Sequence, residues 1–210
     1  MLHFWKSREA AERASVRRLG ILPAAFNPPT IAHLEMAHQA SRQYALDEVL
    51  LLLPRIFPHK EYSGAGIEQR LEMLKAALAG EPQFTIGSTD KGLFLDIARE
   101  CRPVYGAEAE FFFLCGRDAA ERIVDWDYGP GTRFTDQLQE FQMLVAPRQG
   151  PYPAPPEYAG RIHALGLPPE LEPCSSSAVR NAIAAGRSWE HLVAPGVAGI
   201  IRREGLYLGF

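Results

Sequence analysis

The feature that most constrains the fold is an uninterrupted apolar run at residues 49–53, with the sequence VLLLL. A run without polar alternation is typical of a strand buried on both faces, as at the centre of a parallel sheet. A second apolar run lies at 19–22, and residues 30–44 between the two show helical periodicity. Strand, helix and strand in this order predict a βαβ unit, which is right-handed in nearly all proteins.

The alternation continues along the chain. Further strands are predicted at 84–86, 110–115 and 141–146, and helices at 67–78, near 93–97 and from 116 to about 124. We therefore predict an α/β fold, a Rossmann-like doubly wound parallel sheet with helices on both faces. In such sheets ligands bind beyond the carboxyl ends of the strands, near a topological switch point.

The segment after the first predicted strand has the sequence FNPPTIAH, residues 26–33. Proline is tolerated in a first helical turn, and Asn27 or Thr30 can supply the N-cap oxygen. His33 is then expected in the first turn of a helix, where free N–H groups and the helix dipole favour a phosphate. A capped helix with a solvated histidine has the same pattern, so these eight residues alone leave both readings open.

Two other segments have residues suited to phosphates or sugars. CSSSAVR, residues 174–180, starts a predicted helix that Gly186 ends, and three consecutive hydroxyls exceed what capping requires. With Arg180 one turn later, these hydroxyls form a second plausible phosphate cradle. Gly116-Arg117-Asp118 follows the predicted strand EFFFLC, where Asp118 is either a ligand or a helix N-cap.

Composition excludes several classes of protein. The hydrophobic content of 47% and charged content of 22% are ordinary for a globular domain, and a net charge of −3 offers no attraction to nucleic acid or anionic membrane. Three widely spaced cysteines with no CxxC or Cys/His cluster argue against a zinc site. We expect a cytoplasmic protein that binds neither nucleic acid nor membrane; homo-oligomerisation is left open.

Residues 1–17 are expected to be an N-terminal extension containing a short helix, with Phe4 and Trp5 anchoring it to the domain. Residues 18–210 form the domain itself, with a small helical part from about 174 to 210.

Taken together, these segments resemble the nucleotidyltransferase superfamily (cytidylyltransferase-like) that carries an HxGH-type motif and a later ISSTxxR-type motif. Within it, the chain is most similar to nicotinate- and nicotinamide-mononucleotide adenylyltransferases. GILPAAFNPPTIAH and CSSSAVR match the two motifs, and FPHK, IEQRLEMLKAAL, FTIGSTDKGL, FFFLCGRDAAERIVDW and VAPGVAGIIRREGLY match in order and spacing. The resemblance covers roughly residues 18–208.

The chain departs from the family pattern in two places. Ala24 and Ala25 stand where two glycines are usual, which predicts a less close approach of the backbone to the nucleotide. Thr30 and Ala32 replace the first histidine and the glycine of the HxGH-type motif, so His33 is its only imidazole. A Thr-x-x-His form is similar to that of the eukaryotic nicotinamide-mononucleotide enzymes.

The resemblance implies that a mononucleotide phosphate attacks the α-phosphorus of ATP, releasing pyrophosphate on a pathway to NAD. The nucleophile is already an anion, so no general base is needed, and catalysis depends on positioning and charge neutralisation. Mg²⁺ would be held mainly by the phosphates and water, so no protein metal site is expected.

The same resemblance implies the site residues. His33, Thr30 and Arg180 are the catalytic candidates. His33 would contact the α-phosphate, and Thr30 would replace a histidine contact with a shorter hydrogen bond, made directly or through water. Arg180 would hold the β- and γ-phosphates together with Ser176 and Ser177. Further ATP contacts are expected from Phe26, Asn27, Gly116, Asp118 and Lys60, and mononucleotide contacts from Thr85, Trp126 and Arg148.

Alternatives stay open at this point. Lys60 can equally be a solvated loop lysine, and Trp126 can be ordinary core. Arg148 or backbone N–H groups would decide between nicotinate and nicotinamide. Three other functions compete with this one. The protein could transfer the nucleotidyl group to another phosphate acceptor, use CTP, or bind a nucleotide without catalysing a reaction.

Overall fold

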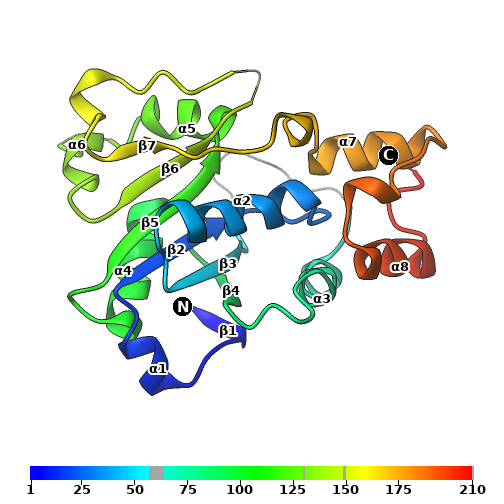
Figure 1. Cartoon of the computed structure of the whole chain (residues 1–210), viewed down its shortest axis with the longest axis horizontal. Helices are drawn as coiled ribbons and strands as arrows, with labels where there is room; N and C mark the ends of the chain where they lie inside the picture. The colour runs from blue at the N-terminus through cyan, green and yellow to red at the C-terminus, as the bar shows by residue number, and fades with distance from the viewer. Residues whose placement is uncertain (57–63, 130, 149, 210) are drawn as a thin grey trace.

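The computed structural model describes residues 1–56, 64–129, 131–148 and 150–209 of the chain. These residues form a seven-stranded sheet in the order β1-β4-β3-β2-β5-β6-β7, in which every pairing is parallel except that of β1 with β4 (Figure 1). The predicted doubly wound parallel sheet is confirmed. Its strands are β1 (His3–Lys6), β2 (Arg18–Pro23), β3 (Glu48–Pro54), β4 (Phe84–Thr89), β5 (Glu110–Gly116), β6 (Gln142–Ala146) and β7 (Ile162–Ala164).

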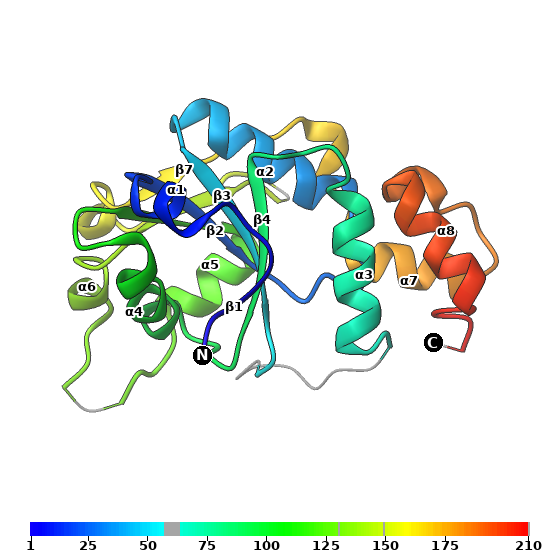
Figure 2. The ribbon, with the colours of Figure 1, turned by 90° about the horizontal axis from the view of Figure 1, so that it is seen from below.

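Helices cover both faces of this sheet. The core on one face includes residues of α4, α5 and α6, and the core on the other includes residues of α2 and α3. Figure 2 shows α4 and α5 on the side of the sheet opposite α2. None of the helices in the described ranges is long and apolar enough to span a bilayer. The helices are α1 (Ala10–Ala14), α2 (Ile31–Gln43), α3 (Ile67–Ala77), α4 (Phe94–Tyr105), α5 (Arg117–Val124), α6 (Phe134–Gln137), α7 (Ser176–Ala184) and α8 (Pro195–Glu204).

The strand with the longest apolar run lies inside the sheet, as its sequence predicts. All seven residues of β3 are buried, with β2 and β4 paired on either side. The topological switch point lies at β2, which pairs with β3 on one side and with β5 on the other. From β2 the chain continues through α2 to β3, and from β5 through α5 to β6, so the two connections leave in opposite directions. A crevice is expected where this happens.

The last helices form a small unit at one end of the molecule (Figure 1). α7 and α8 pack with α3 around a core of their own, which confirms the predicted C-terminal helical part. This core includes Met73, Val179, Ile183, Val197 and Ile201. Because α3 also packs on the main sheet, it connects the C-terminal unit to the rest of the domain.

The N-terminal segment differs from its prediction. Besides the short helix α1, it contributes β1, an antiparallel edge strand that pairs with β4. Phe4 packs against the main core as expected, but Trp5 remains 47% exposed and is held by a hydrogen bond from its indole Nε1 to Ser88 Oγ, 3.0 Å away. The four residues of β1 are too short a run for periodicity to identify, and β7, with three residues, was missed for the same reason.

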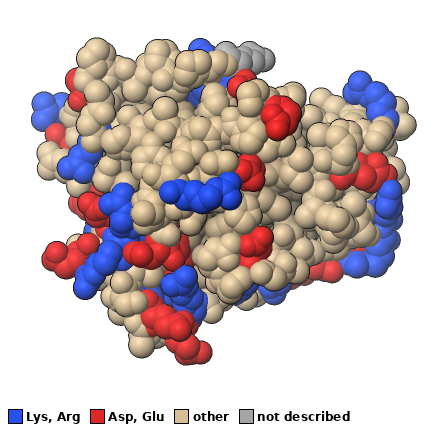
Figure 3. Space-filling view, in the orientation of Figure 1, with Lys and Arg blue, Asp and Glu red and all other residues tan. Residues whose placement is uncertain are grey.

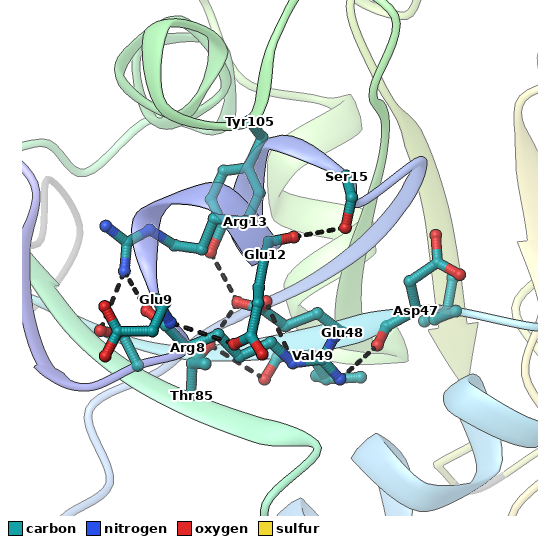
Figure 4. Close-up of polar contacts among 12 residues, drawn as sticks. Arg8, Glu9, Glu12, Arg13, Ser15, Asp47, Glu48, Val49, Thr85 and Tyr105 are labelled. Carbon is teal, nitrogen blue, oxygen red and sulfur yellow. Dashed lines mark hydrogen bonds and ion pairs between the residues drawn. The ribbon is translucent and has the colours of Figure 1, made fainter.

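The segment before β2 also covers a buried carboxyl group (Figure 4). Glu48 on β3 is 1% exposed, and its Oε1 accepts hydrogen bonds from Thr85 Oγ1 at 2.8 Å and Tyr105 OH at 2.7 Å. Its Oε2 lies 3.8 Å from Arg8 Nε of the N-terminal segment. Burial and the nearby carboxyl of Glu48 raise the pKa of Tyr105. β4, α4 and the N-terminal segment therefore all contact the buried carboxyl group of Glu48 on β3.

Replacing Tyr105 with phenylalanine should lower the free energy of unfolding by about 1.5–3 kcal/mol, because the buried carboxyl of Glu48 loses a hydrogen bond. Urea denaturation monitored by circular dichroism measures the change. Tyr158→Phe is the matched control, since Tyr158 packs on Phe134 without a hydrogen bond from its hydroxyl within the described residues. Equal stability of Tyr105→Phe and wild type would contradict the assignment.

Candidate active site

A cavity of about 550 Å³ opens where β2 and β5 end, at the predicted switch point. It is lined by the loop after β2 and by the first turns of α2, α5 and α7, which are far apart in the sequence. Most of the predicted site residues meet here. Those lining the cavity are Phe26, Asn27, His33, Gly116, Asp118, Arg148, Ser176, Ser177 and Arg180.

The loop between β2 and α2, residues 24–30, is held in place by side chains of other helices. Side chains of α3 and α7 donate hydrogen bonds to three of its carbonyl oxygens. Such contacts satisfy backbone groups that have no partner in a helix or strand. The pairs are Arg70 Nη1 to Ala25 O at 3.1 Å, Arg180 Nη1 to Asn27 O at 2.7 Å and Ser176 Oγ to Pro28 O at 2.8 Å.

The side chain of Asn27 connects this loop to two distant parts of the chain. The residue is 3% exposed, and its Oδ1 accepts a hydrogen bond from Tyr207 OH at 2.8 Å and another from the backbone N–H of Ala65 at 3.2 Å. Burial raises the pKa of Tyr207, so its hydroxyl stays a donor. The last turn of the chain thus reaches the first motif, and the side-chain oxygen of Asn27 is occupied by protein donors.

Thr30 and His33 form a pair at the start of α2. Thr30 is the N-cap, is 1% exposed and lies behind His33 rather than in the cavity lining. Its backbone N–H donates to His33 Nδ1 at 3.1 Å, and its Oγ1 lies 2.7 Å from the same nitrogen. A nitrogen that accepts an N–H carries no proton, so the imidazole proton is on Nε2. A direct hydrogen bond from Thr30 to a phosphate does not fit this position, because its hydroxyl contacts His33 and the residue is not in the lining.

His33 is neutral at pH 7. Burial lowers its pKa from 6.5 to about 4, because the charged imidazolium would lose hydration. His33 therefore offers a hydrogen-bond donor and no positive charge. Cationic stabilisation in this part of the cavity comes from Arg180 and from the N-terminal ends of helices.

The serines at the start of α7 have three different contacts. Ser175 is the N-cap and accepts the N–H of Ala178 at 3.1 Å. Ser176 donates to the loop at Pro28, and Ser177 Oγ accepts from Arg180 Nη2 at 3.3 Å. The second motif is thereby fastened to the first, and its hydroxyls, its arginine and a helix N-terminus face one cavity.

Asp118 and Arg148 form an ion pair at the carboxyl end of β5 and β6, with Arg148 Nη1 3.0 Å from Asp118 Oδ2. Both are about half exposed, so the pair contributes little to stability and can open toward a ligand. Gly116, just before Asp118, has nothing within 4 Å of the place where a Cβ would lie. The backbone there is open to the cavity.

The structure also corrects the prediction for Thr85, and it places Trp126 outside the cavity lining. Thr85 is 1% exposed near the amino end of β4, where it bonds Glu48, so it does not line a pyridine pocket. The sequence match pointed to the wrong end of this strand. Trp126 lies just beyond α5, 39% exposed, and is not in the lining. Lys60 lies outside the described residues.

Several lining residues were missed from sequence. Phe94, Arg122 and Tyr128 face the cavity from α4, from α5 and from the segment after α5. Arg122 could have been found, because it is four residues after Asp118 and so lies on the same face of α5. Arg70 and Tyr207 hold the loop from distant positions, and no local pattern marks them.

The model of the cytidylyltransferase-like family matches residues 21–182, which include both motifs at the cavity. The chain belongs to this family. It is 31% identical over 195 residues to a protein of Exiguobacterium sibiricum named a probable nicotinate-nucleotide adenylyltransferase, covering 90% of this chain and 98% of that protein. A protein of the same name from Gloeobacter violaceus is 32% identical over 203 residues, covering 90% and 96%.

Solved structures with the same fold are also found. The nicotinic acid mononucleotide adenylyltransferase of Plasmodium falciparum, complexed with NaAD, superposes with a TM-score of 0.71 at 16% identity, covering 91% of this chain and 97% of that one. The resemblance found in the sequence is therefore confirmed at the level of the family. Ala24 and Ala25, which replace the usual glycines, have no positive φ and need no left-handed backbone.

We predict that His33 titrates near pH 4 and holds its proton on Nε2 throughout the neutral range. Nitrogen-15 NMR of the imidazole rings, recorded from pH 4 to 8, distinguishes the tautomer and gives the pKa. Because the folded pKa lies below 6.5, protonation favours the unfolded state, so this group's contribution to stability falls as pH drops from about 6.5 toward 4. Titration of His33 near 6.5, or a proton on Nδ1, would show that the pair with Thr30 is misassigned.

Proposed function

We propose that this protein transfers AMP from ATP to nicotinate mononucleotide, forming the dinucleotide and pyrophosphate in NAD biosynthesis. The observation that carries the proposal is the meeting of the two motifs, at residues 26–33 and 174–180, on one cavity at the switch point. The printed names of the relatives support the same activity. Free, buried cysteines and a reaction that uses ATP support a location in the reducing cytoplasm.

The chemistry suits the groups that line the cavity. A phosphate oxygen of the mononucleotide attacks the α-phosphorus of ATP, and the bond from that phosphorus to the oxygen bridging to the β-phosphate breaks. The electron pair leaves with pyrophosphate, so no proton has to be removed from the nucleophile. Catalysis then consists of aligning the two phosphates and stabilising negative charge on the transferring group.

His33 is placed to stabilise the α-phosphate. Its Nδ1 is engaged by Thr30, which leaves Nε2–H as the donor from the first turn of α2. A neutral donor with a fixed tautomer needs no reorganisation when charge develops. Thr30 acts as the positioning residue for this imidazole.

Arg180, Ser177 and the N-terminus of α7 form the place for the leaving pyrophosphate. The guanidinium of Arg180 contacts both Asn27 O and Ser177 Oγ, so it also keeps the two motifs at a constant separation. ATP enters as its magnesium complex. The phosphates and water would be the main ligands of the magnesium ion, because Mg²⁺ at such sites keeps several waters and binds through substrate phosphates.

Asp118 and Gly116 lie where a ribose can be bound. A carboxylate accepts hydrogen bonds from sugar hydroxyls, and the open space at Gly116 lets the nucleotide approach the backbone. Arg148, paired with Asp118, orients that carboxylate.

Replacing His33 with alanine should lower kcat by about 10²- to 10³-fold, the scale for losing one preorganised donor. The Kd for ATP should change much less, because Arg180 and the α7 N-terminus remain. The assay measures pyrophosphate release from Mg-ATP with nicotinate mononucleotide, nicotinamide mononucleotide or phosphopantetheine as the acceptor. A parallel assay uses CTP in place of ATP. Together they give the rate and identify the preferred substrates.

His191→Ala is the matched control, since His191 is exposed and lies outside the cavity. Wild type that turns over none of the panel would refute the proposed function. Full activity of His33→Ala would remove His33 from the mechanism.

Thr30→Val should lower kcat by about 2- to 15-fold, clearly less than His33→Ala, because only the hydroxyl contact is lost while the backbone N–H still holds Nδ1. Thr30→Ser, which keeps the hydroxyl, should stay near wild type. The imidazole nitrogen-15 spectrum reports whether the tautomer is retained. A loss in Thr30→Val as large as that in His33→Ala would mean that Thr30 contacts the substrate directly.

A further inference from the structure

The cavity has walls from both faces of the sheet. The loop after β2, α2 and α7 bring His33 and Arg180 from one side, and α4 and α5 bring Phe94, Asp118 and Arg122 from the other. Figure 2 shows α4 and α5 on the face of the sheet opposite α2. Both motifs with phosphate-binding character belong to the first wall. The α4–α5 wall is therefore available to a different part of the substrates.

The charges on the α4–α5 wall do not balance. Arg148 and Asp118 neutralise one another across 3.0 Å. Arg122 also lines the cavity, and within the described ranges of the chain it has neither a hydrogen bond nor an ion-pair partner. By contrast, Arg117 on the same helix is paired with Glu121 at 2.7 Å. One unpaired guanidinium thus remains on this wall.

The surroundings of Arg122 suit a flat apolar ring with an anionic substituent. Phe94 stacks on Phe113 at 4.3 Å between ring centroids, so its ring is held rigidly in the wall. Tyr128 is held by a hydrogen bond from its hydroxyl to Ile123 O at 2.8 Å. Arg122 itself is exposed, so a ligand that enters the cavity beside these rings can reach its guanidinium.

The charge of Arg122 also acts on a buried thiol that lines the same cavity. Cys115, on β5, is buried, and burial raises the pKa of its thiol to about 12 while the guanidinium of Arg122 opposes that rise. Both Cys115 and Arg122 line the cavity.

We propose that Arg122 is the specificity residue that distinguishes a pyridine carboxylate from a pyridine carboxamide. Its planar guanidinium can donate two parallel N–H groups to the two oxygens of a carboxylate, whereas a neutral carboxamide offers one oxygen and directs an NH₂ group at the cation. The inference rests on the proposed function, because it names the group of the mononucleotide that this wall recognises. It favours Arg122 over Arg148, whose charge Asp118 already neutralises.

The test compares Arg122→Gln and Arg122→Lys with wild type, using nicotinate mononucleotide and nicotinamide mononucleotide with saturating Mg-ATP. Arg122→Gln should lower kcat/KM for the nicotinate substrate by about 10- to 100-fold, mainly through KM, and leave that for the nicotinamide substrate within about threefold. Arg122→Lys keeps the charge without the bidentate geometry and should fall in between. Arg117→Gln, on the same helix but outside the lining, is the matched control.

Binding of both mononucleotides without ATP, measured by calorimetry, separates this inference from the proposed function. If Arg122→Gln weakens the binding of nicotinate mononucleotide but not of nicotinamide mononucleotide, the role of Arg122 is supported. This conclusion holds even if the wild-type protein shows no turnover, which would refute only the proposed activity. Equal losses for both mononucleotides, unchanged affinity in Arg122→Gln, or no binding of either mononucleotide by wild type would each overturn it.

Discussion

The active site depends on how the loop between β2 and α2 is held. Carbonyl oxygens of this loop accept hydrogen bonds from α3 and α7, and the side chain of Asn27 accepts one from the last turn of the chain. Carbonyls bonded in this way present less negative partial charge to a phosphate in the cavity. The same contacts keep α2 and α7, and with them His33 and Arg180, at a constant separation.

This arrangement also explains why the C-terminal unit packs where it does. α7 and α8 share a core with α3, and α3 provides Arg70, which bonds the loop directly. The motif at the start of the domain and the motif near its end are thus connected both by an apolar core and by hydrogen bonds. A shift of any one of these helices would change the separation between His33 and Arg180 in the cavity.

The positive charge in the cavity comes from a few groups in its lining and does not reflect the charge of the whole protein surface. The protein carries a net charge of −3, and on the face seen in Figure 3 acidic and basic side chains are intermingled, most visibly over the N-terminal segments. Within the cavity, helix N-termini, Arg180 and Arg122 provide positive potential, while His33 stays neutral. Positive potential for an anionic ligand therefore comes from groups that line the cavity and not from the net charge of the protein.

The sequence by itself determined the sheet and both motifs. Apolar runs such as 49–53 and 111–115 are typical of buried strands, and helix start signals after the run 19–22 and at the serines 175–177 position His33 and Arg180 correctly. These are local properties, since periodicity and capping depend on neighbours within a few residues. Short edge strands such as β1 and β7 carry too little of that signal to be found.

Only the tertiary structure decided which side chains meet. Tyr207 and Asn27 are 180 residues apart, yet they share a hydrogen bond, and nothing near either residue marks the other as its partner. Likewise Glu48 lies in a correctly predicted strand, but its bond to Tyr105 follows from packing α4 on the sheet. Which cation is neutralised, Arg148, and which is left for a ligand, Arg122, depends on distances of a few ångströms across the cavity. Such distances are set by the packing of whole elements, so a linear pattern does not contain them.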